Sequence, residues 1–199
     1  MRRTILAYAC ALTGLLAAGV AHAAQGVEYD PLTHQPLVQS PGALGAGGRP
    51  LATAIPRETV YFNGKYAPGT IVISTAERRL YYVLPGGQAV KYGVGVGRPG
   101  FEWGGVKTIT MKREWPDWTP PAQMLRRRPD LPRHMKGGIE NPLGARAMYL
   151  GGTLYRIHGS NEPETIGQAV SSGCIRMTND DVTDLYNRVS VGTKVVVMR

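Results

Sequence analysis

The chain has 199 residues, enough for one domain of ordinary size plus a tail. A domain of that size can bury a sizeable hydrophobic core. It carries 23 Lys and Arg against 14 Asp and Glu, a formal net charge of +9. That balance favours acidic partners, either nucleic acid or an anionic envelope surface. A basic surface that serves only solubility fits the charge equally well.

The first residues have the pattern of a secretory signal peptide. Met1-Arg2-Arg3 is positive, an apolar run extends from Ile5 to Val20, and Ala21-His22-Ala23 is a small-x-small cleavage site. The run is shorter than the ~20 apolar residues of a spanning helix. We therefore predict a signal peptide over residues 1–23, a mature protein in the periplasm or cell envelope, and no stable membrane span after cleavage.

Residues 24–57 are rich in Pro, Gly, Ala and Gln and show no hydrophobic periodicity. Such a composition is typical of a flexible tether. We expect the tether to precede a single catalytic domain over residues 58–199.

The predicted domain is mainly β, with one or two helices. Runs rich in β-forming residues predict strands at 70–74, 79–84, 89–96, 147–150, 154–157 and 194–198. Helical spacing of apolar residues predicts one amphipathic helix, through Val182, Leu185, Tyr186 and Val189. Thr178 is its predicted N-cap, and Gly192 ends the helical region.

Two segments have less regular patterns. Gly93-Val94-Gly95-Val96-Gly97 lacks the glycine spacing and the following helix of a dinucleotide-binding loop. We interpret it as a strand whose glycines allow another backbone to approach closely. Residues 103–138 are interrupted by prolines, so we expect an irregular segment there. Its tryptophans favour order, and hence a lid or a substrate wall over a plain surface excursion.

Cys174 is the only cysteine outside the predicted signal peptide. In an exported protein a lone thiol indicates chemistry or intermolecular pairing, and an inert buried thiol is the alternative. His158 lies at the end of a predicted strand, and Cys174 follows Gly173 in a loop before the helix. A thiolate with an imidazole base is an acyl-transfer pair. The tight turn at Gly173 allows neighbouring N–H groups to face an oxyanion.

A metal site is not expected. The predicted mature chain has three histidines, at His34, His134 and His158, and no two candidate ligands have the short spacing of a metal site. Acyl transfer of the kind expected here requires neither a metal nor an organic cofactor.

His158-Gly159 followed by Ser171-Ser172-Gly173-Cys174-Ile175-Arg176-Met177 resembles the signature of the L,D-transpeptidase catalytic domain, of YkuD type. Further segments resemble the periplasmic branch of that family, at 118–121, 141–144, 155–163, 166–167 and 192–197. The resemblance covers roughly residues 70–199. It implies a mainly β, sandwich-like or barrel-like catalytic domain.

The resemblance implies Cys174 as the nucleophile and His158 as its base, with the Gly159 carbonyl holding the imidazole tautomer. It implies support of the site and its oxyanion by Gly173, Ser171, Ser172 and Arg176. The predicted substrate cleft contains Tyr155, Asn161, Trp115 and Trp118. Two features depart from the family pattern. Ser172 stands where many members have histidine, and Pro99–Gly105 replaces the usual Thr-Pro-x-Gly hairpin.

The implied activity is attack on the third residue of a peptidoglycan stem tetrapeptide. Terminal D-alanine leaves, and an amine of a second stem takes the acyl group to give a 3→3 cross-link. Water as acceptor would make the protein an L,D-carboxypeptidase, and an amine of an envelope protein or lipoprotein would attach that protein to the wall. A sortase-like cysteine peptidase and a catalytically silent wall-binding module remain as alternatives. Nucleic acid is not an expected partner.

Overall fold

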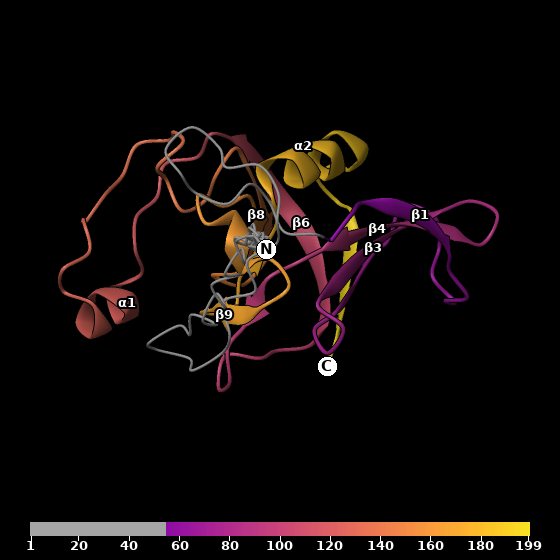
Figure 1. Cartoon of the computed structure of the whole chain (residues 1–199), viewed down its shortest axis with the longest axis horizontal. Helices are drawn as coiled ribbons and strands as arrows, with labels where there is room; N and C mark the ends of the chain where they lie inside the picture. The colour runs from indigo at the N-terminus through magenta and orange to yellow at the C-terminus, as the bar shows by residue number, and fades with distance from the viewer. Residues whose placement is uncertain (1–54) are drawn as a thin grey trace, which may run out of the picture. The chain divides into compact units, whose positions relative to one another are not determined.

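The computed structural model describes residues 55–199. The predicted signal peptide and residues 24–54 of the predicted tether lie outside the described residues. The elements, in chain order and labelled as in Figure 1, are β1 (Glu58–Tyr61), β2 (Ile71–Ser74), β3 (Arg79–Leu84), β4 (Gln88–Gly93), β5 (Val96–Gly97), β6 (Gly105–Glu114), α1 (Ala122–Arg127), β7 (Arg146–Leu150), β8 (Arg156–His158), a 3-10 turn η1 (Pro163–Thr165), β9 (Ala169–Ser171), β10 (Ile175–Arg176), α2 (Asn179–Arg188) and β11 (Lys194–Met198). The mainly β prediction is confirmed.

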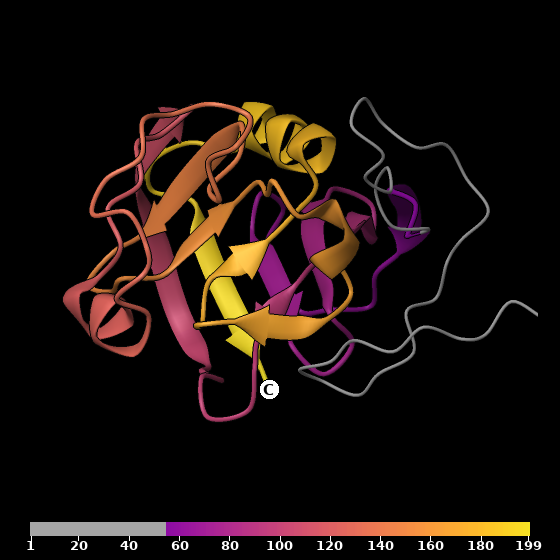
Figure 2. The same cartoon turned by 60° about the vertical axis from the view of Figure 1, so that its left-hand side comes forward.

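Nine strands form one sheet in the order β1-β4-β3-β2-β11-β6-β7-β8-β10, and β5 pairs separately with β9. Neighbours in the large sheet are antiparallel except for the β11–β2 and β10–β8 pairs, which are parallel. Figure 2 shows the sheet curling as it runs from β2 and β3 towards β8 and β10. The C-terminal strand β11 fills the centre, so the last residues of the chain join the two halves of the sheet.

Strand β6 corrects the expectation that residues 103–138 are irregular. Its first half pairs with β11, its second half pairs with β7, and the register shifts between Ile109 and Met111. Within β6 only Ile109 is buried. The strand therefore depends on backbone pairing along both edges. Its sequence has no regular alternation of apolar residues that would predict a strand. Helix α1 is a second regular element within the same segment.

The other strand predictions are largely confirmed, as β2, β3, β7, β8 and β11. The run predicted at 89–96 divides into β4 and the short β5. The glycines of that run do allow close backbone approach: Gly95 and Arg176 exchange two backbone hydrogen bonds of 2.9 Å each. Strand β1, which pairs with β4, is an addition to the predicted set.

Helix α2 packs on β7 and completes the core. Val182 and Leu185 are fully buried, in one cluster with Ile109 and Met148. The predicted N-cap is confirmed, since the Thr178 hydroxyl accepts a hydrogen bond of 3.1 Å from the Asp181 N–H. Because α2 begins directly after β10, its cap and its buried face hold the end of that strand in place.

Candidate active site

The parallel pairing of β8 and β10 decides which side chains meet. Ile157 is opposite Ile175, and His158 is opposite Arg176. Side chains alternate along a strand, and residues in register lie on the same face. The two isoleucines are buried in the core, so His158 faces the other way. One position earlier in this register is Cys174, which therefore shares the face of His158.

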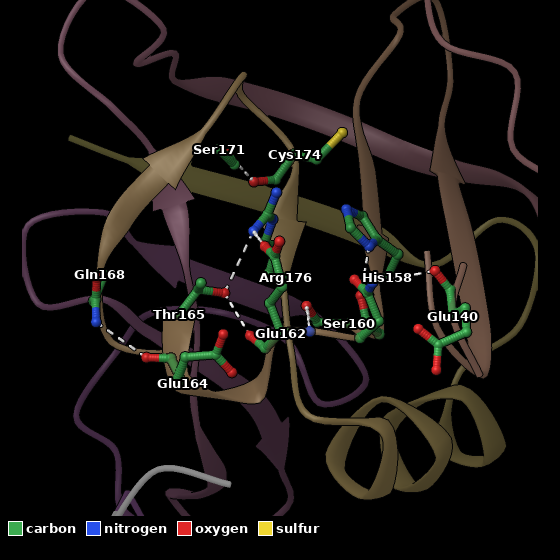
Figure 3. A network of polar contacts seen from close by, with 12 residues as sticks. Glu140, His158, Ser160, Glu162, Glu164, Thr165, Gln168, Ser171, Cys174 and Arg176 are labelled. Carbon is green, nitrogen blue, oxygen red and sulfur yellow. Dashed lines mark hydrogen bonds and ion pairs between the residues drawn. The ribbon is translucent and has the colours of Figure 1, made fainter. Parts of the chain in front are cut away.

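His158 is almost fully buried, at 4% exposure. Its Nδ1 lies 2.6 Å from the carbonyl oxygen of Gly159. A carbonyl can only accept, so this contact assigns the proton to Nδ1 and leaves Nε2 as an acceptor. Figure 3 shows the imidazole beneath the Cys174 thiol, on the same side of the β8–β10 pair. The ring is thus held in the tautomer that can accept a proton from a nucleophile.

The surroundings of His158 and Cys174 favour the neutral form of each side chain. Burial, together with the neighbouring charge of Arg176, lowers the pKa of His158 to about 3, and the bond to Gly159 opposes this only partly. Burial also raises the pKa of the Cys174 thiol, against the hydrogen bonding and charge of Arg156. The thiol points weakly at the Leu154 carbonyl, with its sulfur 3.9 Å from that oxygen. Burial thus favours a resting state with a thiol beside a neutral imidazole.

The turn that carries Cys174 is closed by Ser171. The Ser171 hydroxyl accepts from the Gly173 N–H at 3.0 Å and donates to the Cys174 carbonyl at 2.6 Å. Gly173 has a φ of +106°, a conformation that side chains other than hydrogen rarely allow. The backbone N–H groups of Gly173 and Cys174 are the two candidate oxyanion donors of this turn. Because the Gly173 N–H already donates to Ser171, the Cys174 N–H is the one that remains.

Two aromatic residues pack against this turn. The Trp103 indole N–H donates to the Gly173 carbonyl at 2.7 Å. The same indole stacks on Tyr155, with ring centroids 4.7 Å apart. A Cβ at Gly173 would overlap the Tyr155 ring, so glycine is required here for space as well as for conformation. Tyr155 thus packs against the turn that carries Cys174, and its place in a substrate cleft stays a prediction. Trp103 was not predicted as a site residue.

The polar contacts of Arg176 and Asn161 stabilise the loop between β8 and β9. Arg176 forms an ion pair of 2.8 Å with Glu162 and lies 3.4 Å from the Thr165 hydroxyl. The Asn161 amide donates to the Glu140 carbonyl at 3.1 Å, which ties the loop after β8 to the segment before β7. These contacts, several of them drawn in Figure 3, fix the loop between β8 and β9 around the catalytic pair.

Gly159 is required by close packing behind the histidine. A Cβ there would overlap the side-chain oxygen of Asn179, the first residue of α2. That oxygen already accepts a hydrogen bond of 2.9 Å from the Ala145 N–H. The start of α2, the end of β8 and the turn before β7 therefore meet with no room for a side chain at Gly159.

The remaining predicted cleft residues, Trp115 and Trp118, lie earlier in the chain, between β6 and α1. Trp118 and Met135 exchange two backbone hydrogen bonds. Trp115 is 45% exposed, and its backbone N–H donates to the Ala145 carbonyl. The contacts of both tryptophans are thus with residues 116–145, and their place in a cleft stays a prediction. Ser172 is half-buried in the nucleophile turn.

Arg156 is a second residue that was not predicted as part of the site. It lies two positions before His158 on β8, opposite Tyr149 of β7, and hence on the catalytic face. The alternation along β8 was a usable signal, because a charged residue at that position shares the face of the histidine. Trp103 offered no comparable signal, since its partners come from distant parts of the chain.

Within residues 55–199, no group of three His, Cys, Asp or Glu side chains is arranged to hold a metal ion. The same residues include no helix long and apolar enough to cross a membrane.

The sequence profile of the YkuD family, the L,D-transpeptidase catalytic domain, matches residues 68–197. This chain belongs to that enzyme family. The probable L,D-transpeptidase ErfK/SrfK of Escherichia coli (strain K12) is 42% identical over 137 residues, covering 64% of this chain and 43% of that protein. Probable L,D-transpeptidase YbiS of the same strain is 39% identical over 134 residues, covering 63% and 43%. The chain thus spans less than half the length of these relatives.

Solved structures agree with the family fold. An L,D-transpeptidase from Mycobacterium smegmatis has a TM-score of 0.53 at 20% identity, covering 65% of this chain and 58% of that one. A Brucella melitensis structure titled as a probable carnitine operon oxidoreductase is 47% identical, with a TM-score of 0.50, covering 74% and 96%. In this family member the glycine-rich segment 93–97 lies in β4 and β5 with no helix following, unlike a dinucleotide-binding loop.

Proposed function

We propose that this family member is a peptidoglycan L,D-transpeptidase that works through a thioester at Cys174. The observation that carries the proposal is the placement of Cys174 and His158 on one face of the β8–β10 pair. The Gly159 carbonyl leaves the imidazole Nε2 available as a base. The family supplies the reaction class, and the site supplies a nucleophile and a base in the matching arrangement.

In the first half-reaction the Cys174 sulfur attacks the carbonyl carbon of the third stem residue. Since thiol and imidazole are both neutral at rest, the thiol proton passes to His158 Nε2 during the attack and not before it. The Cys174 N–H is the proposed oxyanion donor. Collapse breaks the bond to terminal D-alanine, which takes the proton back from the imidazolium and leaves a thioester.

In the second half-reaction an acceptor amine attacks the thioester. His158 takes a proton from the amine, the carbon–sulfur bond breaks, and the Cys174 thiol is restored with that proton. A stem amine yields a 3→3 cross-link, and an amine of an envelope protein or lipoprotein would yield attachment to the wall. The predicted signal peptide and the basic charge support a location in the periplasm, facing an anionic envelope.

The experiment is incubation of the purified mature protein with defined tetrapeptide stems, with and without a second stem as acceptor. We expect release of D-alanine, a thioester adduct on the Cys174 peptide, and dimers joined 3→3, all resolved by mass spectrometry. Cys174→Ala should abolish each product while retaining the circular dichroism spectrum of the wild type, because one small half-buried side chain is changed. A wild-type protein that never releases D-alanine would overturn the proposal.

The same products separate the alternatives. D-alanine release without dimers, even at high acceptor concentration, indicates an L,D-carboxypeptidase. Binding to isolated cell walls with no product indicates a silent wall-binding module. Cleavage of an internal peptide bond in a longer sorting-type peptide, with tetrapeptides untouched, indicates a sortase-like peptidase.

A further inference from the structure

Arg156 places a guanidinium group next to the nucleophile. Its backbone position is between Tyr149 on β7 and, by the register of β8 and β10, Cys174 on the other side. The guanidinium lies over the Tyr149 ring, with its central carbon 5.0 Å from the ring centroid. The residue as a whole is half-buried.

The charge of Arg156 lacks a carboxylate partner in the part of the chain that the structure describes. Its neighbours differ in this respect: Arg176 pairs with Glu162 at 2.8 Å, and Arg146 pairs with Glu114 at 3.3 Å. The Arg156 side chain makes a long hydrogen bond, 3.4 Å from Nη1 to the Leu154 carbonyl, and it also lies within hydrogen-bonding reach of the Cys174 thiol. Its Nε is buried and has no hydrogen-bond partner, which is also true of the Nε of Arg146, although Arg146 has its carboxylate partner.

A buried donor without an acceptor is rare in native proteins, and at a catalytic site it indicates a group that the ligand satisfies. The ligand group should be anionic and planar, because a guanidinium presents parallel N–H donors that match a carboxylate. Aromatic packing from Tyr149 on one side holds the guanidinium plane and reduces the rotamer entropy lost on binding.

We propose that Arg156 binds the terminal carboxylate of the donor stem, the carboxylate of the residue that leaves. This inference rests on the proposed function, since it names the substrate group recognised at that same site. The terminal carboxylate is attached to the α-carbon next to the scissile nitrogen. When the scissile carbonyl reaches the Cys174 sulfur, a side chain adjacent to that sulfur is in position to meet the carboxylate.

The proposal makes Arg156 a specificity-determining residue. A donor must then end one residue after the scissile bond. A further residue moves the carboxylate away by about 3.5 Å, and a terminal amide removes its charge. Arg156 would thus select tetrapeptides over pentapeptides by an attraction that only the shorter chain can make.

The test compares three donors: a tetrapeptide acid, its C-terminal amide, and a pentapeptide acid. Acylation of Cys174 in the mature protein is followed by mass spectrometry. We expect the wild type to favour the tetrapeptide acid over the amide by roughly 10- to 100-fold in kcat/KM, chiefly through KM, the range expected for a charge-assisted hydrogen bond. Arg156→Gln should reduce the acid to the level of the amide. Because Arg156 also opposes the rise in the pKa of Cys174, both donors should slow somewhat, and the acid-to-amide ratio of kcat/KM is the readout. Arg156→Lys should recover part of the preference, because lysine keeps the positive charge but lacks the parallel N–H donors of the guanidinium group.

Arg113→Gln, which removes an arginine of β6 with an exposed side chain, is the matched control and should keep the full preference for the acid. Wild-type protein that acylates acid and amide equally would overturn the inference, and that comparison requires no variant. An equal loss for both donors in Arg156→Gln would also overturn it, since Arg156 would then act on the thiol or on the fold. In either case the proposed function stands as long as D-alanine is released. If no stem reacts with the wild type, the proposed function and this inference both fail.

Discussion

Trp103 and Tyr155 stack face to face, with ring centroids 4.7 Å apart and planes 9° from parallel. The same indole donates a hydrogen bond to the Gly173 carbonyl. One side chain from the loop after β5 therefore holds both an aromatic wall of the site and the turn that presents Cys174. The loop itself is held by Phe101, whose ring lies under the guanidinium groups of Arg98 and, from α1, Arg127.

Replacing Trp103 by Phe keeps a ring for the stack and removes the N–H that binds Gly173. We expect kcat to fall about 5- to 20-fold with a smaller change in KM, because the nucleophile turn loosens while the cleft wall persists. The free energy of unfolding should drop by about 1 kcal/mol, the usual net value of one hydrogen bond. Steady-state D-alanine release and urea unfolding measure the two effects. Tyr61→Phe, at a position 78% exposed on β1, is the control and should change neither; an unaltered kcat in Trp103→Phe would contradict the positioning role.

Gly173→Ala should be far more damaging than an alanine at another glycine of positive φ. At Gly173 the added methyl meets the Tyr155 ring, whereas at Gly86, with a φ of +73°, nothing lies within 4 Å. Gly86→Ala therefore measures the backbone cost alone, about 1 kcal/mol. We expect Gly173→Ala to reduce the free energy of unfolding by at least twice that amount and to abolish D-alanine release. Urea unfolding of the two variants side by side checks this, and equal destabilisation would show that the Tyr155 contact does not constrain the turn.

Acidification should destabilise the protein through His158. Burial lowers the pKa of His158 to about 3 in the folded state, against about 6.5 when unfolded. The unfolded chain therefore binds the extra proton first, and stability that is present above pH 6.5 is lost as the pH falls towards 3. The loss is at most about 1.4 kcal/mol per pH unit. Urea unfolding at pH 7, 6 and 5 should show a shallower decline for His158→Asn than for the wild type.

His134→Asn serves as the control for that experiment, because the His134 side chain is 52% exposed beside Asp117. The free energy of unfolding of His134→Asn should decline with falling pH as steeply as that of the wild type. A decline in His158→Asn as steep as that of the wild type would mean that other groups cause the acid sensitivity.

The Cys174 thiol should react as a thiol and not as a preformed ion pair. Because burial raises the pKa of Cys174, thiolate is scarce at neutral pH, and the rate of alkylation by iodoacetamide should climb about tenfold per pH unit between pH 6 and 8. Its midpoint should lie above that of glutathione alkylated in parallel. Peptide mass spectrometry of the mature protein follows alkylation at Cys174. A rate plateau between pH 5 and 7 would reveal a thiolate–imidazolium pair and contradict the neutral resting state.

The parts of the fold that the sequence predicted are those supported by local patterns. The period of Val182 and Leu185 and the cap at Thr178 predicted α2, because helix formation depends on neighbours three and four residues apart. Runs of β-forming residues predicted β2, β3 and β11 for a similar reason. Strand β6 was missed, because its stability comes from two partners distant in sequence and not from its own residue order.

The site divides in the same way. By itself the sequence predicted the chemistry proposed for this protein, from a lone thiol outside the predicted signal peptide, an imidazole at a strand end, and the spacing that resembles the family motif. Only the tertiary structure decided what surrounds that pair, since Trp103 reaches Gly173 across 70 residues and Arg156 meets Cys174 through the register of two parallel strands. The physical reason is that reactivity depends on residue type and local turn geometry, whereas burial, stacking and an unpaired charge arise when remote segments pack together.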